Sequence, residues 1–584
     1  MRSKDGMRMT RVTLGAMLLL LLAGPATWKA QSDASLLPEK PNIVFILTDD
    51  QRWDSATMSD GGREVMPNLR QELISDGVLF SNAFVSTPLC CPDRASLLAG
   101  GYYAHNTGVL TNELPNGGFE KFVDRDSLAV RLRQAGYETA LVGKYINKYA
   151  LTDAYVPPGW SSFAALHQMR SWFDYDVVLG NGTPDEPVHG SVVVSSQYLT
   201  RYLAQRATDF IESSSGEAPF FLYYAPVAPH EPATPAPGDE NVFADFAYKG
   251  RSAGEGDLTD KPRYVRDLAK TYDATQIELF ARQQIRSLQS VDRSIAAIVN
   301  AVRRKGLLEE TVFIFTSDNG YLWGEHRLSG KAYPYEESIH VPLVIRMPGV
   351  TPRVEDKPVV TNVDIGATIS DLAGLNRVTD GISLRPLLED PSTAWRTEFL
   401  IQGFGDLRWS GMRGSYGGRV WKYVEHASGE RELYDLKADP FERSSRHKQT
   451  NKTVREVIKS FSAKVAAARG LTVLDSLLPD AQGGATYAYP MSIWGGRAPF
   501  HWSVVEGQLP PGLALDPSTG LIKGAPMPGP GGARFRLRVE DSSTSAYSGL
   551  PQSYEQWLNL AVRDPQSAQH VAPAMGIDMS SDQQ

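Results

Sequence analysis

Four short, continuously apolar segments constrain the fold of this chain more than any other feature of its sequence. They cover residues 42–48, 139–142, 220–225 and 312–317 and are rich in β-branched and aromatic side chains. Unbroken apolar runs of this length are typical of parallel strands that are buried on both faces. Helical patterns lie between them, so the sequence predicts the α/β class.

Two helices are well marked between these strands. One is predicted over residues 127–135, with Asp126 as its N-cap and Gly136 as its C-terminal stop. A longer one runs from about residue 275 to residue 304 and ends before Gly306. Residues 229–261 are rich in Pro, Gly and Asp, and two interpretations stay open for them: a loop over a binding site, or a solvated connection.

Polar residues follow each of the four predicted strands. Ligands of open α/β sheets bind beyond the carboxyl ends of the strands, so residues at these ends can meet although they are distant in sequence. We expect the following side chains to converge at one edge of the sheet: Asp49, Asp50, Lys144, His230, Asp318 and Asn319.

The first thirty residues have the composition of an export signal. Basic residues come first, an apolar run covers residues 12–23, and small residues follow around 24–26. The run is shorter than the roughly 20 residues that span a bilayer. We therefore predict a cleaved signal peptide over 1–30, an exported protein in the periplasm or outside the cell, and no membrane span after cleavage.

The chain has two cysteines, and they are adjacent. A disulfide between Cys90 and Cys91 would be strained, because neighbouring Cα atoms lie about 3.8 Å apart and disulfides usually need roughly 4.4 to 6.8 Å. An unpaired thiol in an oxidising compartment calls for a chemical explanation.

The C-terminal part differs in composition from the rest, and the change falls near residues 478–482. Short strand patterns with Gly and Pro turns predict a β-sandwich over 483–563, with a half-buried strand at 533–539. The series Leu-Pro-Pro-Gly-Leu at 509–513 with Thr519-Gly520 resembles the Ig-like modules of bacterial exported enzymes. We expect a spacer or attachment module and a bacterial source, and we expect a disordered tail over 564–584.

Charge restricts the partners of the chain. It has 59 Lys and Arg against 67 Asp and Glu, a formal net charge of -8. This balance argues against a nucleic-acid partner, which would need a basic surface. An anionic substrate would have to be met by cations placed locally.

The cysteine lies in a motif of known spacing, Cys90-x-Pro92-x-Arg94-x-x-x-Leu98-x-Gly100. This resembles the signature of the formylglycine-dependent sulfatases of the alkaline-phosphatase-like superfamily, and its spacing selects Cys90 as the residue that is oxidised. Pro92 suits a first helical turn, so the reactive atom is expected at a helix N-terminus, which favours anions. Asp93 and Ala99 depart from the residues usual in the family.

The resemblance implies the fold and the maturation of the chain. The fold would be a mixed sheet between helices over 38–385, a small antiparallel subdomain over 386–475, and the appended all-β module. A formylglycine-generating enzyme would oxidise Cys90 to an aldehyde, which hydrates to a diol. One hydroxyl then attacks sulfur and the alcohol leaves; the other loses its proton, and sulfate is expelled.

The resemblance also implies a metal site. Its ligands would be Asp49, Asp50, Asp318 and Asn319, together with oxidised Cys90. Independently of the family, these are hard oxygen donors that suit calcium better than zinc. Calcium is therefore the expected ion, and magnesium is the alternative.

The family pattern maps the remaining catalytic roles onto Arg94, Lys144, His230 and Lys331. Either His230 or Lys331 is the candidate proton donor to the leaving alcohol. Asn147, His105 and His326 are candidate supporting residues around the site, although His326 could equally be a surface histidine. The Lys-Tyr-Ile-Asn run at 144–147 resembles the N-acetylglucosamine-6-sulfatase branch, beside the arylsulfatases.

The predicted function is hydrolysis of sulfate monoesters, on a sulfated sugar or glycan in preference to a small aryl ester. One alternative is a phosphodiester or phosphonate monoester hydrolase of the same superfamily. A second, of another class, is a non-catalytic exported protein that binds glycans. The complete set of nucleophile, metal and cationic positions favours the enzyme.

Overall fold

The computed structural model describes residues 37–563, apart from residues 249, 251, 357–359, 530 and 546–547. The predicted signal peptide (1–30) and the predicted tail (564–584) lie outside the described residues. Within the described ranges, no helix combines the length and the apolar character needed to cross a bilayer.

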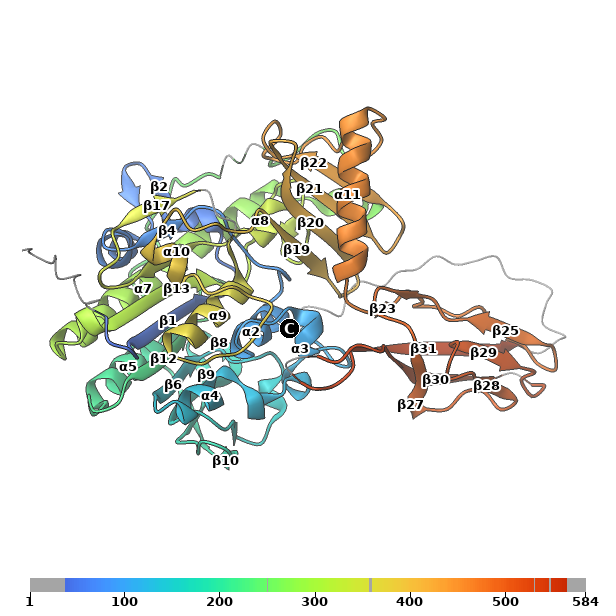
Figure 1. Cartoon of the computed structure of the whole chain (residues 1–584), viewed down its shortest axis with the longest axis horizontal. Coiled ribbons are helices and arrows are strands. Elements are labelled where there is room, and N and C mark those ends of the chain that lie inside the picture. The colour runs from blue at the N-terminus through green and yellow to red at the C-terminus, as the bar shows by residue number, and fades with distance from the viewer. Residues whose placement is uncertain are drawn as a thin grey trace, which may run out of the picture.

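A ten-stranded mixed sheet forms the centre of the molecule (Figure 1). Its order is β11-β9-β8-β6-β12-β1-β13-β16-β4-β17. The five strands β8, β6, β12, β1 and β13 run parallel to one another, and antiparallel strands flank them. The strands are β1 (Asn42–Thr48), β4 (Val78–Phe80), β6 (Glu138–Gly143), β8 (Ser162–Ser171), β9 (Asp174–Gly180), β11 (Ser191–Ser195), β12 (Phe220–Ala225), β13 (Thr311–Ser317), β16 (Leu343–Arg346) and β17 (Arg353–Glu355).

Helices cover both faces of this sheet. Strand β1 is therefore buried on both sides, which explains why its sequence is apolar throughout. Ile43, Phe45 and Leu47 join one core, with α2 (Cys90–Leu98), α4 (Leu128–Gln134) and α9 (Asn362–Leu372). Val44 and Ile46 join the opposite core, with α5 (Leu199–Ser213) and α7 (Ala274–Arg304). Successive side chains of a strand point to opposite faces, so a strand covered on both sides must be apolar at every position.

The four predicted strands are all present within one residue of their predicted ends. The two predicted helices are also present, but the cap of the first was wrong. Ser127 is the N-cap of α4 and accepts a hydrogen bond from the backbone of Val130. Asp126 bonds to Arg131 and Arg377 instead, so the carboxylate serves as an ion-pair partner. Gly136 follows the helix with a positive φ of 92°, a conformation that favours glycine.

The segment that follows β12 is anchored to the protein at several positions. Ala236, Phe243 and Phe246 are buried in the core that α7 also joins, and Ala233 is buried as well. At its start this segment carries His230 and Glu231, which line the cleft described below. Of the two interpretations left open, the loop beside a binding site is supported at the start of the segment, and the four buried residues anchor a stretch that is otherwise largely exposed.

A four-stranded antiparallel sheet follows the central domain, in the order β19-β20-β21-β22. One long helix, α11, packs on it through Val454, Val457, Phe461 and Val465 (Figure 1). The elements are β19 (Glu398–Gly403), β20 (Trp409–Tyr416), β21 (Arg419–His426), β22 (Arg431–Asp435) and α11 (Lys452–Ala468).

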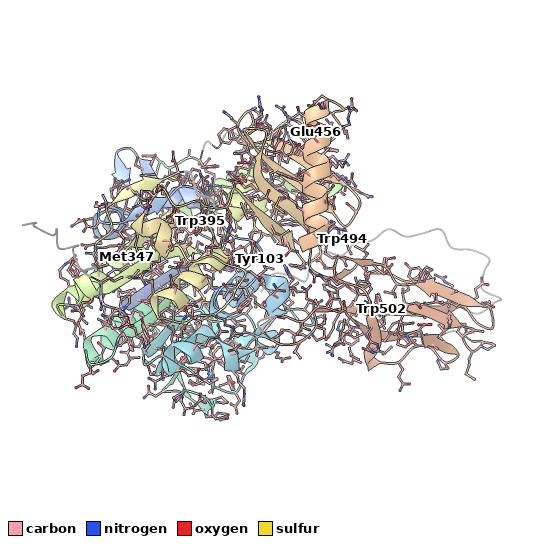
Figure 2. The ribbon with its side chains drawn as sticks, viewed as in Figure 1. Tyr103, Met347, Trp395, Glu456, Trp494 and Trp502 are labelled. Atoms are coloured by element: carbon pink, nitrogen blue, oxygen red, sulfur yellow. The ribbon has the colours of Figure 1, made fainter. Side chains whose placement is uncertain are left out.

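The C-terminal part is a β-sandwich, with sheets in the orders β24-β31-β30-β27 and β25-β29-β28. It projects to one side of the molecule, with Trp502 inside it and Trp494 near its junction (Figure 2). The strands are β24 (Ala481–Gln482), β25 (Tyr487–Pro490), β27 (His501–Gly507), β28 (Leu513–Leu515), β29 (Leu521–Gly524), β30 (Gly531–Glu540) and β31 (Ser553–Arg563). Before the sandwich, β23 (Thr472–Val473) pairs with β26 (Ile493–Trp494).

Candidate active site

The parallel strands deliver polar residues to one edge of the sheet. Asp49 and Asp50 follow β1, Lys144 follows β6, and Asp318 follows β13. Gly143 allows the turn into Lys144: its φ is 118°, and a Cβ there would lie 2.0 Å from the carbonyl oxygen of Ala225. We call the following nine residues the floor: Asp49, Asp50, Cys90, Arg94, Lys144, His230, Asp318, Asn319 and Lys331.

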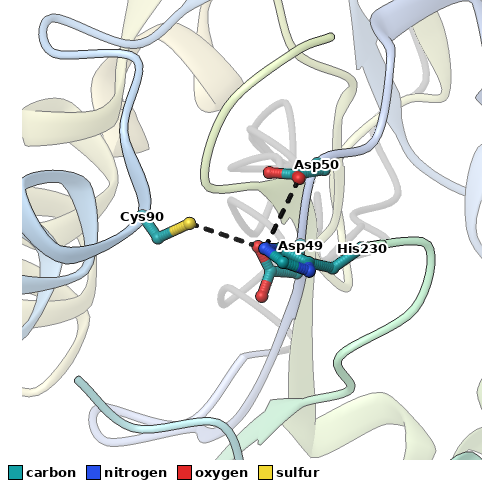
Figure 3. Close-up of side chains that lie close together, drawn as sticks. All are labelled: Asp49, Asp50, Cys90 and His230. Carbon is teal, nitrogen blue, oxygen red and sulfur yellow. Dashed lines mark hydrogen bonds and ion pairs between the residues drawn. The ribbon is translucent and has the colours of Figure 1, made fainter. Parts of the chain in front are cut away.

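Cys90 opens helix α2 and points its thiol into this edge of the sheet (Figure 3). Its Sγ donates to Oδ1 of Asp49 at 3.5 Å and accepts from Nζ of Lys331 at 2.8 Å. Burial, and next the charge of Asp49, raise the pKa of the thiol to about 12. An unmodified Cys90 is therefore a neutral thiol at physiological pH, which makes it a poor nucleophile.

The neighbouring Cys91 is also free and buried, and it faces the apolar core. Its backbone N–H donates to Oδ1 of Asn112 at 2.9 Å. The two thiols are thus on different sides of α2, and of the two only Cys90 contacts floor residues.

The two aspartates after β1 are neutralised by different cations. Oδ2 of Asp49 accepts from Lys144, and Oδ1 of Asp50 accepts from Lys331. Burial alone would raise the pKa of Asp49, but the cations around it, Lys144 foremost, hold it well below its usual range. Asp49 is therefore charged, and the floor holds fixed charge away from solvent.

Arg94 is completely buried and contacts the carboxylates of Asp49 and Asp318. Its Nε donates to Oδ2 of Asp318 at 2.9 Å, and one Nη lies 3.6 Å from Oδ2 of Asp49. A third contact joins the guanidinium to the backbone oxygen of Lys144 at 3.2 Å. Burial and the charge of Asp49 still raise the pKa of Asp318 to about 6.

The lysines are held as cations by the same carboxylates. Burial would lower the pKa of Lys331, yet Asp50 and the other acidic floor groups raise it well above its usual value. Lys144 is shifted in the same direction, with Asp49 as the main favourable partner. Both ammonium groups reach the cleft and are available to an anion there.

His230 differs from the other floor residues because its side chain is 32% exposed. Its Nε2 lies 3.7 Å from Oδ2 of Asp50, and its Nδ1 is 2.8 Å from the carbonyl oxygen of Glu231. Figure 3 shows the ring beside the two aspartates, opposite Cys90. The imidazole thus lies between the carboxylates and the open cleft.

The donors of the floor fit a hard divalent cation. Ligand atoms of Asp49, Asp50, Cys90 and His230 all lie within 4.8 Å of one another. Nδ2 of Asn319 donates to Asp50 at 2.7 Å, while its buried Oδ1 has no hydrogen-bond partner among the described atoms. Carboxylate and amide oxygens are the ligands that calcium and magnesium prefer.

Of the three candidate supporting residues, only Asn147 lines the same cleft as the lysines. His105 lies in α3 (Ala104–Thr107), stacks on Tyr103, and places Nδ1 2.7 Å from Oε1 of Gln402. The structure thus puts His105 at the junction between the domains.

His326 is fully buried, so the interpretation as a surface histidine was wrong. Its Nδ1 is 2.8 Å from Oε2 of Glu255, and its ring packs against Tyr335. Glu337 and Glu442 offer oxygen atoms nearby. This closed group of charges lies between the central domain and the antiparallel subdomain.

Asp93 of the cysteine motif is buried, and neither carboxyl oxygen makes a hydrogen bond of good geometry among the described atoms, although the side chain of Asn362 lies close enough to act against the rise in its pKa. Burial, and next the charge of Asp318, raise its pKa well above the usual range. The unusual residue is therefore carried as a neutral acid, which avoids an unpaired buried charge.

A cleft of about 1160 Å³ opens above the floor, and Lys144, His230 and Lys331 line its deep end. Its outer part is formed by three segments that are far apart in sequence. We call them the rim: residues 111–116, residues 404–406 with Arg408, and residues 554–557. No motif or spacing in the sequence marks these segments, so sequence reasoning missed the rim entirely.

The chemistry available at the floor follows from this arrangement. The side chain of residue 90 lies beside buried cations and beside oxygen atoms that could bind a metal. Lys144 and Lys331 connect this group of residues to the open cleft. Fixed charges in a water-poor site stabilise the charge that develops when a group is transferred from an anionic ester.

Comparison with known proteins places this arrangement in context. Residues 41–375 match the Sulfatase family, and residues 324–470 match the C-terminal region of N-sulphoglucosamine sulphohydrolase. Residues 471–551 match a family of Ig domains.

Two curated relatives illustrate the similarity in sequence. Arylsulfatase of Volvox carteri is 30% identical over 504 residues, covering 75% of this chain and 76% of its own. Human N-acetylglucosamine-6-sulfatase is 35% identical over 387 residues, covering 63% and 68%.

Two solved structures illustrate the similarity in fold. BT4656, in complex with its substrate D-glucosamine-2-N,6-O-disulfate, has a TM-score of 0.59 and 23% identity, covering 74% of this chain and 99% of its own. Phosphonate monoester hydrolase of Agrobacterium radiobacter has a TM-score of 0.58 and 22% identity, covering 74% and 95%. The predicted fold class is confirmed, and the fold alone does not separate sulfate from phosphonate chemistry.

Proposed function

We infer that this chain, which belongs to the sulfatase family, hydrolyses sulfate monoesters carried on a sugar or glycan, with formylglycine at position 90 and one calcium ion. One observation carries the proposal. The side chain of residue 90 is buried within hydrogen-bond distance of Asp49 and Lys331, and Lys331 lines the cleft.

The buried cations would bind the substrate's sulfate group. Lys144 and Lys331 hold their protons firmly, and each reaches the cleft from a carboxylate that fixes its position. Arg94 acts below them and keeps Asp49 and Asp318 in place. Such pre-arranged cations stabilise charge on the equatorial and leaving oxygens without reorganising during the reaction.

His230 is the stronger candidate for the proton donor. A sugar alcohol leaves poorly as an alkoxide, so an acid that protonates the leaving oxygen speeds the reaction. The imidazole is partly exposed and faces the cleft, whereas Lys331 is bonded to Asp50 and Cys90, and the acidic groups around it raise its pKa well above the usual value.

Asp49, Asp50, Asp318 and Asn319 would hold the metal, with the oxygen of oxidised residue 90 as a further ligand. A bound calcium ion would orient and polarise the sulfate group. Magnesium is the alternative ion. The oxidised residue, as a hydrated aldehyde, would supply the hydroxyl nucleophile that a neutral thiol cannot.

A sugar is the preferred substrate class for two reasons. Relatives in this family include N-acetylglucosamine-6-sulfatases, and a structural neighbour was solved with a disulfated glucosamine. The cleft volume of about 1160 Å³ also exceeds the roughly 300 to 1,000 Å³ typical of pockets for one small ligand.

We also propose how the protein is matured and exported. A formylglycine-generating enzyme would be a transient partner of Cys90 during maturation. The predicted signal peptide would direct the protein to the periplasm or the medium of a bacterium.

A side-by-side assay tests the function against its nearest rival. Matured protein is given 4-nitrophenyl sulfate, a 6-sulfated glucosamine, a phosphodiester and a phosphonate monoester at equal concentration. We expect kcat/KM to favour the sulfate esters, and a preference for a phosphorus ester by orders of magnitude would overturn the proposal. Binding of sulfated glucosamine with no turnover of any ester would instead support the non-catalytic glycan-binding protein.

A further inference from the structure

The outer wall of the cleft is built partly by the C-terminal β-sandwich. Residues 554–557 of strand β31 line the same cavity as Lys144, His230 and Lys331. We infer that this module forms a subsite for the sugar next to the sulfated one, so that the protein acts on a glycan chain rather than on a single sugar. This inference rests on the proposed function.

The module is fixed to the central domain by paired hydrogen bonds. Nδ2 of Asn116 donates to the backbone oxygen of Glu555 at 2.7 Å, and the backbone N–H of Glu555 donates to Oδ1 of Asn116 at 2.8 Å. The side-chain amide of Asn116 thus replaces a neighbouring strand at the edge of β31. Such a reciprocal pair sets both the register and the orientation of the strand against the loop at 111–116.

An ion pair between a buried carboxylate and a partly exposed lysine supports the same contact. Nζ of Lys121 lies 3.0 Å from Oε1 of Glu555, whose side chain is 2% exposed. Arg538 of the neighbouring strand bonds to the same oxygen at 2.6 Å. Opposite charges that are paired across an interface favour one defined geometry.

The apolar core also runs across the junction. Ala104, Leu110 and Phe404 of the preceding domains share one cluster of buried side chains with Leu558 and Leu560 of β31. The hydroxyl of Tyr554 lies 3.5 Å from the backbone oxygen of Phe404. A spacer joined by a linker would not need a shared core, so these contacts argue against the expected role as a spacer.

Trp557 is the residue on the rim best suited to hold a sugar ring. It is half-buried and borders the cleft. The guanidinium carbon atoms of Arg534 and Arg536 lie 4.5 and 5.5 Å from its ring centroid, so the ring is held in position before any ligand arrives. The face of an indole is electron-rich and packs well against the C–H groups of a pyranose.

The position of this ring in the cleft defines what it can contact. The floor takes the sulfate group, so the sugar that carries it occupies the deep part of the cleft. Trp557 belongs to the rim, beside the amide of Gln556. A single sugar held by the floor would leave the outer part empty, whereas a longer glycan chain would extend towards it.

The test compares chain lengths. The substrates are 4-nitrophenyl sulfate, a 6-sulfated glucosamine, and a disaccharide and tetrasaccharide that end in the same sulfated sugar. The variants are Trp557→Ala, Trp557→Phe and the matched control Asn559→Ala. Asn559 lies two residues further along the same face of β31, exposed and outside the cleft.

We expect the wild-type kcat/KM to rise about tenfold from the monosaccharide to the tetrasaccharide. Trp557→Ala should abolish this rise, chiefly through KM, and leave 4-nitrophenyl sulfate unaffected. Trp557→Phe should keep most of the rise, and Asn559→Ala should match the wild type. Equal thermal midpoints for the four proteins would exclude a folding defect.

Two outcomes overturn the inference while the proposed function stands. One is a wild-type protein that cleaves sulfate esters without any gain from chain length. The other is a Trp557→Ala variant that keeps the full gain. If matured wild-type protein cleaves no sulfate ester at all, the proposed function itself fails and the inference falls with it.

Discussion

The floor and the rim of the cleft are built on different principles. The floor consists largely of buried charged groups at the ends of the parallel strands and in the adjoining motifs, and oppositely charged groups there hold one another in place. The rim consists largely of half-buried or exposed groups from three distant segments, one of them in a separate β-sandwich. Transfer of a charged group needs fixed charges in a site from which water is largely excluded. Recognition of a large substrate instead needs accessible surface that the substrate can contact.

The difference predicts how substitutions will act. Removing one partner of a buried charge pair leaves the other uncompensated, so changes at the floor should affect all substrates and often stability. Changes at the rim should spare the turnover of small substrates and affect that of large ones, with at most a small effect on stability. The following predictions, from the largest effect to the smallest, test that division.

Cys90→Ala should abolish hydrolysis of every sulfate ester, with a loss of at least about 10⁴-fold in kcat, because no other floor residue supplies the nucleophile. Cys91→Ala is the matched control, since its thiol faces the apolar core. Turnover of 4-nitrophenyl sulfate by both variants is the measurement. Equal loss in the two variants would contradict the assignment of Cys90.

Removal of the metal should lower kcat on all sulfate esters by about 10³-fold, because the ion polarises the group that is transferred. Dialysis against a chelator, followed by addition of calcium or magnesium, measures the loss and the preferred ion. Asp318→Asn should reproduce the loss and weaken calcium binding in calorimetry. Full activity of a protein shown to be free of metal would exclude a catalytic ion.

His230→Ala should separate two kinds of leaving group. On a sugar sulfate, kcat should fall by about 10²-fold, because the alcohol needs a proton as it leaves. On 4-nitrophenyl sulfate the loss should stay below about tenfold, because nitrophenolate leaves unaided. Equal losses on both substrates would assign His230 to binding, and Lys331 would become the candidate acid.

Glu555→Gln should have the smallest effect, a fall of about 2 °C in the midpoint of thermal unfolding. Burial alone would raise the pKa of Glu555, but Arg538 and Lys121 lower it below its usual value. A lowered pKa means that the carboxylate stabilises the folded protein above about pH 4.3, and this contribution is lost as the pH falls further.

The difference in midpoint between wild type and Glu555→Gln, measured from pH 7 to pH 4, should therefore shrink at the acid end. Lys121→Met is a second variant that removes the other half of the contact. A difference that grows as the pH falls would contradict the assigned ion pair.

The floor could be predicted from the sequence, and the reason is physical. Buried parallel strands have a recognisable composition, and their carboxyl ends must meet, so the positions of Asp49, Lys144 and Asp318 in the chain were enough to group them. The resemblance of the motif around Cys90 to the sulfatase signature added the candidate nucleophile, and the same family pattern added Arg94 and Lys331.

The rim could not be predicted in this way. Asn116, Phe404 and Trp557 lie in segments whose proximity depends on how the β-sandwich docks, and docking leaves no periodic pattern in the sequence. The interpretation of His326 as a surface histidine was wrong for a related reason. Its burial depends on Glu255 and Tyr335, which come from other segments. Local sequence patterns predict helices and strands, whereas the rim and the burial of His326 depend on contacts between these elements.

The chemical state of residue 90 tests the account most directly. The peptide that contains residue 90 is analysed by mass spectrometry in several preparations of the protein, and turnover of a sulfate ester is measured in each. We predict an aldehyde at position 90 and an activity that rises in proportion to the converted fraction. Full activity in a preparation whose residue 90 is an unmodified thiol throughout would contradict the account.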